Sequence, residues 1–95
     1  MKLVWSNLAS DELRKLRRYS VERWGREVAL RYLEDVRDAA KQAAADPQTA
    51  RPLRGMLRIL RVRSHCLIVH VDEEAGRVTV ARILHVAMDI ERHLP

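Results

Sequence analysis

The first third of the chain carries apolar residues at the three-to-four-residue spacing of an amphipathic helix. Ser6 and Asn7, both favourable N-cap residues, stand before this run, and Gly25 follows it as a helix-ending residue. We therefore predict a first helix between these points. Its apolar stripe consists of Leu13, Leu16, Tyr19 or Ser20, and Trp24.

A second run with the same helical period begins after Gly25 and continues to Asp46. Pro47 disfavours helical backbone at the residue before it, so the second helix is expected to end there. Because one glycine separates the two helices, the sequence predicts an antiparallel helical hairpin. The second apolar stripe consists of Val28, Ala29, Tyr32, Leu33, Val36, Ala40, Ala43 and Ala44.

The second half of the chain changes to the two-residue alternation of β-strands. Residues 47–55 contain two prolines and a glycine and predict a loop. The segments 57–63, 66–72 and 77–84 are rich in Val, Ile, Leu and Thr, which favour strands. Because short polar links separate these segments, we predict an antiparallel meander.

Adding an edge strand at Lys2–Trp5 and a helical turn at residues 89–94 gives the order β-α-α-β-β-β with a short C-terminal helix. Helices followed by strands indicate an α+β domain, in which the N-terminal helical hairpin packs on a small twisted antiparallel sheet. The opposite face of the sheet is then left for solvent or a partner. With 95 residues, the chain is sized for a single domain, 1–95.

Charge and cysteine content narrow the class of protein. The 18 Lys and Arg residues outnumber the 13 Asp and Glu residues, which gives a net charge of +5 and indicates an anionic partner. A single cysteine excludes an internal disulfide framework and a multi-cysteine metal site, and it fits the reducing cytoplasm. No apolar run approaches the ~18 residues of a membrane span, and the N-terminus lacks the apolar core of a signal peptide.

Candidate catalytic or metal chemistry is sparse. The three glycines stand apart, so no glycine-rich phosphate loop is formed and no cofactor is expected. His65 and His70 are five residues apart, which places them on opposite faces of a strand, so we expect no metal site. Cys66 is expected as a small buried hydrophobic residue, and Trp5 and Trp24 as packing residues.

Five basic residues expected on one sheet are the strongest chemical feature of the chain. They are Arg58, Arg61, Arg63, Arg82 and His85. Because a strand shows one face every second residue, Arg61 and Arg63 are expected to share a face, with Arg58 on the other.

Arg82 stands in an otherwise apolar strand, where an uncompensated charge is costly. Two explanations stay open for it. One is a structural ion pair with Asp89 or Glu91, and the other is a contact with a partner.

Several segments, in order along nearly the whole chain, resemble one known family. They are Ser6-x-x-Ala9-x-x-Glu12-Leu13, residues 19–25 with Ala29 and Tyr32, Asp46-Pro47 with Leu53-Arg54-Gly55, and residues 80–94. The last segment is similar to an ending written R-I-L-H-x-x-M-D-x-x-R-H-L. On these motifs the chain resembles the ParE branch of the RelE/ParE toxin superfamily, the toxin half of bacterial type II toxin–antitoxin modules.

The resemblance implies the fold already predicted and a protein partner, a ParD-like antitoxin. Such antitoxins join a ribbon-helix-helix DNA-binding domain to a tail that folds onto the toxin, so the two would form a hetero-oligomer that reaches DNA only through the antitoxin. A net charge of +5 suits an acidic tail. The resemblance also implies DNA gyrase as the target, inhibited by binding without catalysis, with arrest of replication and growth as the result.

Site residues follow from the same resemblance and from charge. For target binding, the C-terminal match supplies Arg82, His85, Met88, Asp89 and Arg92. For antitoxin binding, the first helix and the sheet supply Arg14, Arg17, Arg18, Trp24 and Arg58.

The RelE-like branch, whose members cut mRNA in the ribosome, is the main alternative. Several of its members use a C-terminal tyrosine, whereas Tyr19 and Tyr32 of this chain fall in predicted helices. For this RelE-like alternative, the basic residues available for phosphodiester cleavage are Arg61, Arg63, Arg82 and His85.

A protein-binding module without toxicity is a second alternative.

Overall fold

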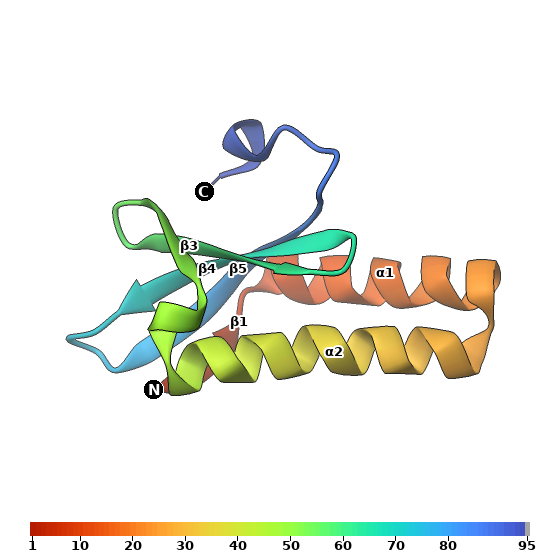
Figure 1. The fold of residues 1–95 in the computed structure, drawn as a ribbon, viewed down its shortest axis with the longest axis horizontal. Coiled ribbons are helices and arrows are strands. Elements are labelled where there is room, and N and C mark those ends of the chain that lie inside the picture. Colours follow the sequence, from red (N-terminus) through yellow and green to blue (C-terminus); the bar gives the residue numbers. More distant parts are fainter. Residues whose placement is uncertain (95) are drawn as a thin grey trace.

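The computed structural model describes residues 1–94 as two long helices packed on one side of a five-stranded sheet (Figure 1). The predicted α+β class and helical hairpin are confirmed. None of the described helices is both long and apolar enough to cross a membrane. The elements in chain order are β1 (Lys2–Trp5), α1 (Asn7–Trp24), α2 (Arg26–Ala45), the 3₁₀ helix η1 (Pro47–Thr49), β2 (Arg51–Arg54), β3 (Leu57–Val62), β4 (His65–Asp72), β5 (Arg77–His85) and the 3₁₀ helix η2 (Ile90–His93).

Local signals set both ends of α1. The Ser6 hydroxyl accepts a hydrogen bond from the Ala9 N–H at 3.0 Å and donates one to the Ala81 carbonyl of β5 at 3.0 Å. Gly25, with a φ of 88°, reverses the chain, and its N–H donates to the Val21 carbonyl at 2.9 Å. The helix boundaries predicted from these residues are confirmed, and the Ser6 cap also fixes the start of α1 against the sheet.

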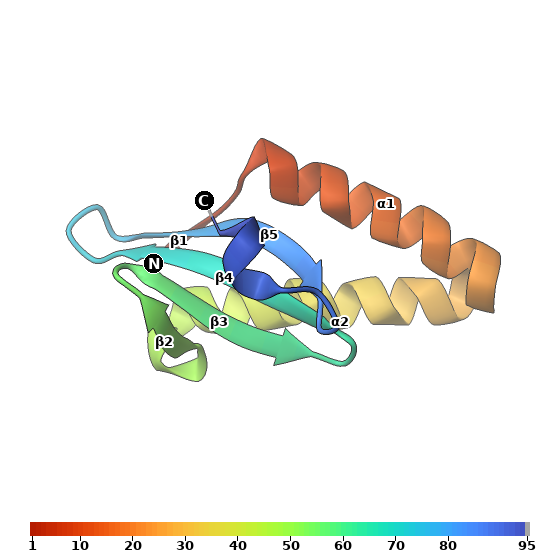
Figure 2. The same cartoon turned by 90° about the horizontal axis from the view of Figure 1, so that it is seen from above.

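The sheet has the order β1-β5-β4-β3-β2 (Figure 2). Strands β3, β4 and β5 form the predicted antiparallel meander, and β2 pairs antiparallel with β3. Strand β1, however, runs parallel to β5, with Leu3 opposite Val78 and Trp5 opposite Val80. The prediction of a purely antiparallel sheet is therefore wrong at this edge. Apolar alternation specifies the buried side of a strand but not its direction, and the long connection between β1 and β5 permits both directions.

Part of the predicted loop 47–55 forms strand β2. Arg51 pairs with Ile59 and Arg54 with Leu57 in an antiparallel register. Because Pro52 has no N–H to donate, a proline at this position disfavours a strand inside a sheet. Strand β2 lies at the edge of the sheet, however, where an outward-facing N–H donor is not needed. The loop prediction missed β2 because strand pairing outweighed this local signal.

Strand β3 ends at Val62, one residue earlier than predicted. Arg63 has a φ of 54° and turns the chain toward β4, as a tight two-residue hairpin link requires. Its carbonyl accepts a hydrogen bond from Arg61 Nε at 2.8 Å. The prediction that Arg61 and Arg63 share one strand face is therefore wrong, because Arg63 is not part of the strand.

The main core lies between the helical hairpin and the sheet. Helix α1 buries Ser20 and leaves Tyr19 56% exposed, so Ser20 is the inward residue of that predicted pair. In the predicted stripe of α2, Val28 is the exception, because it is 40% exposed. The largest fully buried apolar side chains of this core are Leu33, Val36, Leu67, Val69, Val78 and Val80.

A second, smaller core lies on the opposite face of the sheet. Cys66 is buried there, as predicted, together with Leu57, Ile59, Ile68 and Leu84. The expectation that this face is left for solvent or a partner is wrong in part, because the C-terminal segment crosses over it (Figures 1 and 2). Val86, Ile90 and Leu94 of this segment pack against the second core, as does Leu53 of β2.

Candidate functional site

Arg82 forms a buried clamp with Glu12 of α1. Arg82 Nη2 lies 2.9 Å from Glu12 Oε2, Arg82 Nε lies 3.2 Å from both carboxylate oxygens, and the two side chains are each only 17% exposed. Arg82 Nη1 also donates to the His93 carbonyl at 2.8 Å, and Glu12 Oε1 accepts from the Ile83 N–H at 2.9 Å. The clamp therefore joins α1, β5 and η2.

The predicted ion pair of Arg82 with Asp89 or Glu91 is wrong. Asp89 pairs instead with Arg92, at 3.3 Å on an exposed surface. Local spacing suggested a partner in the C-terminal segment, whereas the carboxylate in contact comes from a helix 70 residues away in sequence. In the sequence, Glu12 is part of the helix-opening motif, and nothing else marks it as the partner of Arg82.

A series of aromatic rings connects the end of the helical hairpin to the sheet. Trp24 stacks on Tyr32 with ring centroids 5.9 Å apart, and Tyr19 meets Trp24 edge-on at 6.1 Å. Tyr32 meets His65 edge-on at 5.6 Å, and His65 meets His85 at 5.3 Å. We call these five residues the aromatic ladder. Trp24 is 45% exposed within it, so it packs as predicted while also presenting an indole face to solvent.

Hydrogen bonds fix the two histidines of the aromatic ladder. The Tyr32 hydroxyl lies 2.6 Å from His65 Nδ1, and the Ala87 N–H donates to His85 Nδ1 at 3.1 Å. Burial lowers the pKa of His65 below its ordinary value, and the positive charge that His85 carries when it is protonated lowers it further. His65 is therefore mostly a neutral ring near pH 7. The sequence places it only by its spacing from His70 and does not predict its contacts with Tyr32 and His85.

The residues predicted for antitoxin binding fall in different environments. Arg14, Arg17 and Arg18 border one hollow on the exposed face of α1, where Arg14 also pairs with Asp11. Trp24 lies farther along the helix in the aromatic ladder. Arg58 is half-buried and donates to the Ala50 carbonyl at 2.9 Å, so it stabilises the link into β2.

The four nuclease candidates do not converge on one site. Arg63 pairs with Asp35 at 2.6 Å and lies over the Tyr32 ring, 5.3 Å from its centroid. Arg82 is held in the clamp. Arg61 and His85 line separate hollows, one beside β3 and one beside α1.

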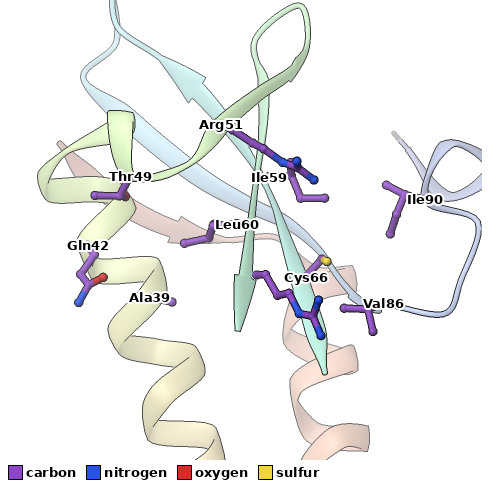
Figure 3. Close-up of a pocket in the computed structure, with 10 residues that line it drawn as sticks. Ala39, Gln42, Thr49, Arg51, Ile59, Leu60, Cys66, Val86 and Ile90 are labelled. Atoms are coloured by element: carbon purple, nitrogen blue, oxygen red, sulfur yellow. The ribbon is translucent and has the colours of Figure 1, made fainter. Parts of the chain in front are cut away.

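A cavity of about 700 Å³ lies beside β3, where Ile59, Leu60 and Arg61 line it (Figure 3). It is bounded by α2 and η1 on one side and by the C-terminal segment on the other. Arg51 extends beside Ile59 in this cavity, and Cys66 lies at its floor (Figure 3). Burial raises the pKa of the Cys66 thiol, and the positive charges of Arg61 and Arg51 offset this increase only in part. The thiol therefore stays protonated near pH 7.

The residues predicted for target binding divide between the clamp and the surface. Arg82 lies in the clamp, where its guanidinium group is bonded to Glu12 and to the His93 carbonyl. His85 is exposed and Met88 is 38% exposed, and the two line the same hollow. Asp89 and Arg92 are both exposed and face each other.

Two solved structures share this fold. A chain of the chromosomal ParDE TA system from P. aeruginosa superposes with a TM-score of 0.78, at 22% sequence identity, over 90% of this chain and 96% of that one. A YoeB/ParE toxin from Agrobacterium tumefaciens superposes with a TM-score of 0.64, at 22% identity, over 90% of this chain and 98% of that one. These two superpositions show that the fold is shared over nearly the whole described chain.

Sequence comparison identifies the family. Residues 3–90 match the ParE toxin of type II toxin–antitoxin system, parDE. Toxin ParE1 from two strains of Mycobacterium tuberculosis, CDC 1551 / Oshkosh and ATCC 25618 / H37Rv, is 35% identical over 96 residues, covering 98% of this chain and 97% of the relative. The chain belongs to the ParE toxin family of type II toxin–antitoxin systems, and the resemblance carried by its motifs is confirmed.

Proposed function

We propose that this toxin inhibits DNA gyrase, thereby blocking replication and arresting growth, and that a ParD-like antitoxin neutralises it. Membership of the ParE family over residues 3–90 is the observation that carries the proposal. The pairing of toxin with antitoxin in ParDE systems supports the hetero-oligomer. In that complex the toxin reaches DNA only through the antitoxin.

The exposed side of α1 suits an acidic and partly apolar antitoxin tail. Arg17, Arg18 and Arg26 surround Val21 there, and none of the three has an ion-pair partner within residues 1–94. Trp24 follows at the end of the helix with an exposed indole face. Positive charge attracts an acidic segment, and an exposed aromatic ring gives it an apolar anchor. We therefore assign this side of α1 to the antitoxin.

The end of β5 and the segment after it suit the target. His85 and Met88 present imidazole and thioether groups at this surface, beside Asp89 and Arg92. Arg82 acts as a positioning residue, because its bond to the His93 carbonyl holds the C-terminal segment against β5. The dispersal of Arg61, Arg63 and Arg82 into separate intramolecular contacts supports inhibition by binding over phosphodiester cleavage.

Induced expression in growing cells separates the gyrase and ribosome targets. Relaxation of plasmid supercoils before any change in mRNA ends is the expected result, and co-expression of the antitoxin encoded beside the toxin should restore supercoiling. New codon-linked mRNA ends with normal supercoiling would contradict the proposal and favour the RelE-like activity. Normal growth with both readouts unchanged would favour a binding module without toxicity.

A further inference from the structure

A hollow of about 340 Å³ lies between α1 and the adjoining ends of β4 and β5. Lys15 and Tyr19 line it from α1, His65 and His85 from the strands, and Met88 from the segment after β5. The two histidines are direct partners in the β4–β5 register. We call this hollow the His–Lys pocket.

The backbone determines where neutral His85 carries its proton. The Ala87 N–H donates a hydrogen bond to His85 Nδ1. Because an acceptor nitrogen needs a free lone pair, Nδ1 carries no proton, and the neutral ring carries its proton on Nε2. His85 therefore provides an Nε2–H donor.

The same conclusion holds for His65 through the Tyr32 hydroxyl. This hydroxyl accepts a hydrogen bond from the Ser64 N–H at 3.2 Å and lies 2.6 Å from His65 Nδ1. Because Nδ1 is the one acceptor that the described residues offer to the hydroxyl proton, we assign this proton to the bond with Nδ1. The proton of neutral His65 is then on Nε2, and the lowered pKa of His65 favours that neutral ring.

The charges around the pocket match one negative charge. Glu12 also borders it, but the carboxylate is occupied by Arg82 and by a backbone N–H of β5. Lys15 has no ion-pair partner in the described chain, so one positive charge stands beside two imidazole N–H donors. A divalent cation is disfavoured because it needs an imidazole lone pair, and both Nε2 atoms carry protons.

We propose that the His–Lys pocket binds a single carboxylate, the side chain of an Asp or Glu residue in the antitoxin tail. The carboxylate accepts hydrogen bonds from the Nε2–H groups of His65 and His85 and from the Lys15 ammonium group. The apolar surfaces of Tyr19 and Met88 suit the aliphatic stem of such a residue. The antitoxin as the source rests on the proposed function, whereas the preference for a carboxylate rests on the donors alone.

Continuity with the surface assigned to the antitoxin selects this partner. Because His85 and Met88 are also assigned to the target, an antitoxin carboxylate bound in the pocket would exclude the target from this surface. Tyr19 borders the pocket and also contacts Trp24 in the aromatic ladder. One tail segment lying along α1 can therefore reach both the exposed indole and the pocket.

Imidazole ¹H–¹⁵N spectra of the full-length toxin, slightly above neutral pH, test the pocket without any partner. Both histidines should show the Nε2–H tautomer, and N-acetyl-glutamate amide should shift both Nε2–H signals in a saturable way with a millimolar Kd. Dimethyl phosphate, a probe for a nucleic-acid phosphodiester, should bind more weakly. An Nδ1–H tautomer at either ring, no saturable shift, or tighter binding of dimethyl phosphate would overturn the proposal.

Matched substitutions identify the donors. In His85→Gln the amide nitrogen reaches the place of Nε2 and the Kd should stay within about twofold, whereas in His85→Asn it reaches only the place of Nδ1 and the Kd should rise about tenfold. Lys15→Met should likewise weaken binding about tenfold, and Lys41→Met, an exposed change on α2, should leave it unchanged. Equal losses in the two His85 variants would contradict the assignment.

The two proposals fail independently. Saturable probe binding by a toxin that leaves gyrase active contradicts the gyrase function and leaves the pocket standing. Gyrase inhibition by a toxin that binds no carboxylate probe contradicts the pocket and leaves the function standing.

Discussion

Glu12→Gln is the substitution that tests the clamp most sharply. It preserves the shape of the side chain and an oxygen that can accept from the Ile83 N–H, but it removes the charge that faces Arg82. The guanidinium would then be a largely buried cation with an amide as its neighbour. Because the clamp joins α1, β5 and η2, the loss should affect the whole fold and not one element.

The size of the effect follows from burial. Breaking a fully buried ion pair costs roughly 3–5 kcal/mol, since the remaining charge is left uncompensated. With both side chains 17% exposed, water compensates part of this cost, and we expect a loss of about 2–4 kcal/mol in the free energy of unfolding. That is a large share of the 5–15 kcal/mol typical of small domains.

Urea denaturation followed by circular dichroism measures this loss. With a slope of about 1 kcal/mol/M, the unfolding midpoint of Glu12→Gln should fall by about 2–4 M. Glu22→Gln, an exposed change on the same helix, is the control and should leave the midpoint within error. A loss below about 0.5 kcal/mol, the range of ordinary surface changes, would refute the reasoning about the clamp.

Three further outcomes are expected. Ser20→Ala should stabilise the fold by up to about 1 kcal/mol, because the buried Ser20 hydroxyl has no hydrogen-bond partner in the described structure. Thermal or urea unfolding measures this change, and a clear destabilisation would contradict the unpaired hydroxyl. Leu33→Ala should cost roughly 2–5 kcal/mol, because Leu33 is 1% exposed in the main core, and a cost under 1 kcal/mol would contradict its central place. Replacing Arg14, Arg17 and Arg18 together by Gln should weaken antitoxin binding and flatten its dependence on salt in calorimetry, whereas an unchanged Kd would remove this face of α1 from the interface.

Features with a local cause could be predicted from the sequence. Ser6 and Gly25 determine the ends of α1 through their own backbone and side-chain chemistry, and the apolar period of α2 specifies its buried face. These signals depend on neighbours within one or two turns, so a single chain carries enough information to interpret them.

Features that depend on distant residues could not be predicted in this way. The direction of β1 is set by its pairing with β5, and the strand at Pro52 forms because β3 offers an edge. In the candidate site, Arg82 was recognised as a charge in need of a partner, but Glu12 was not recognised as that partner. The cross-strand pairing of His65 with His85 likewise exists only once β4 and β5 are in register.

Supercoiling of relaxed plasmid by purified gyrase, in the presence of the purified toxin, tests the central claim most directly. Supercoiling should fall with increasing toxin and return when the antitoxin is added in equal amount. Full supercoiling at a large excess of folded toxin would contradict the account.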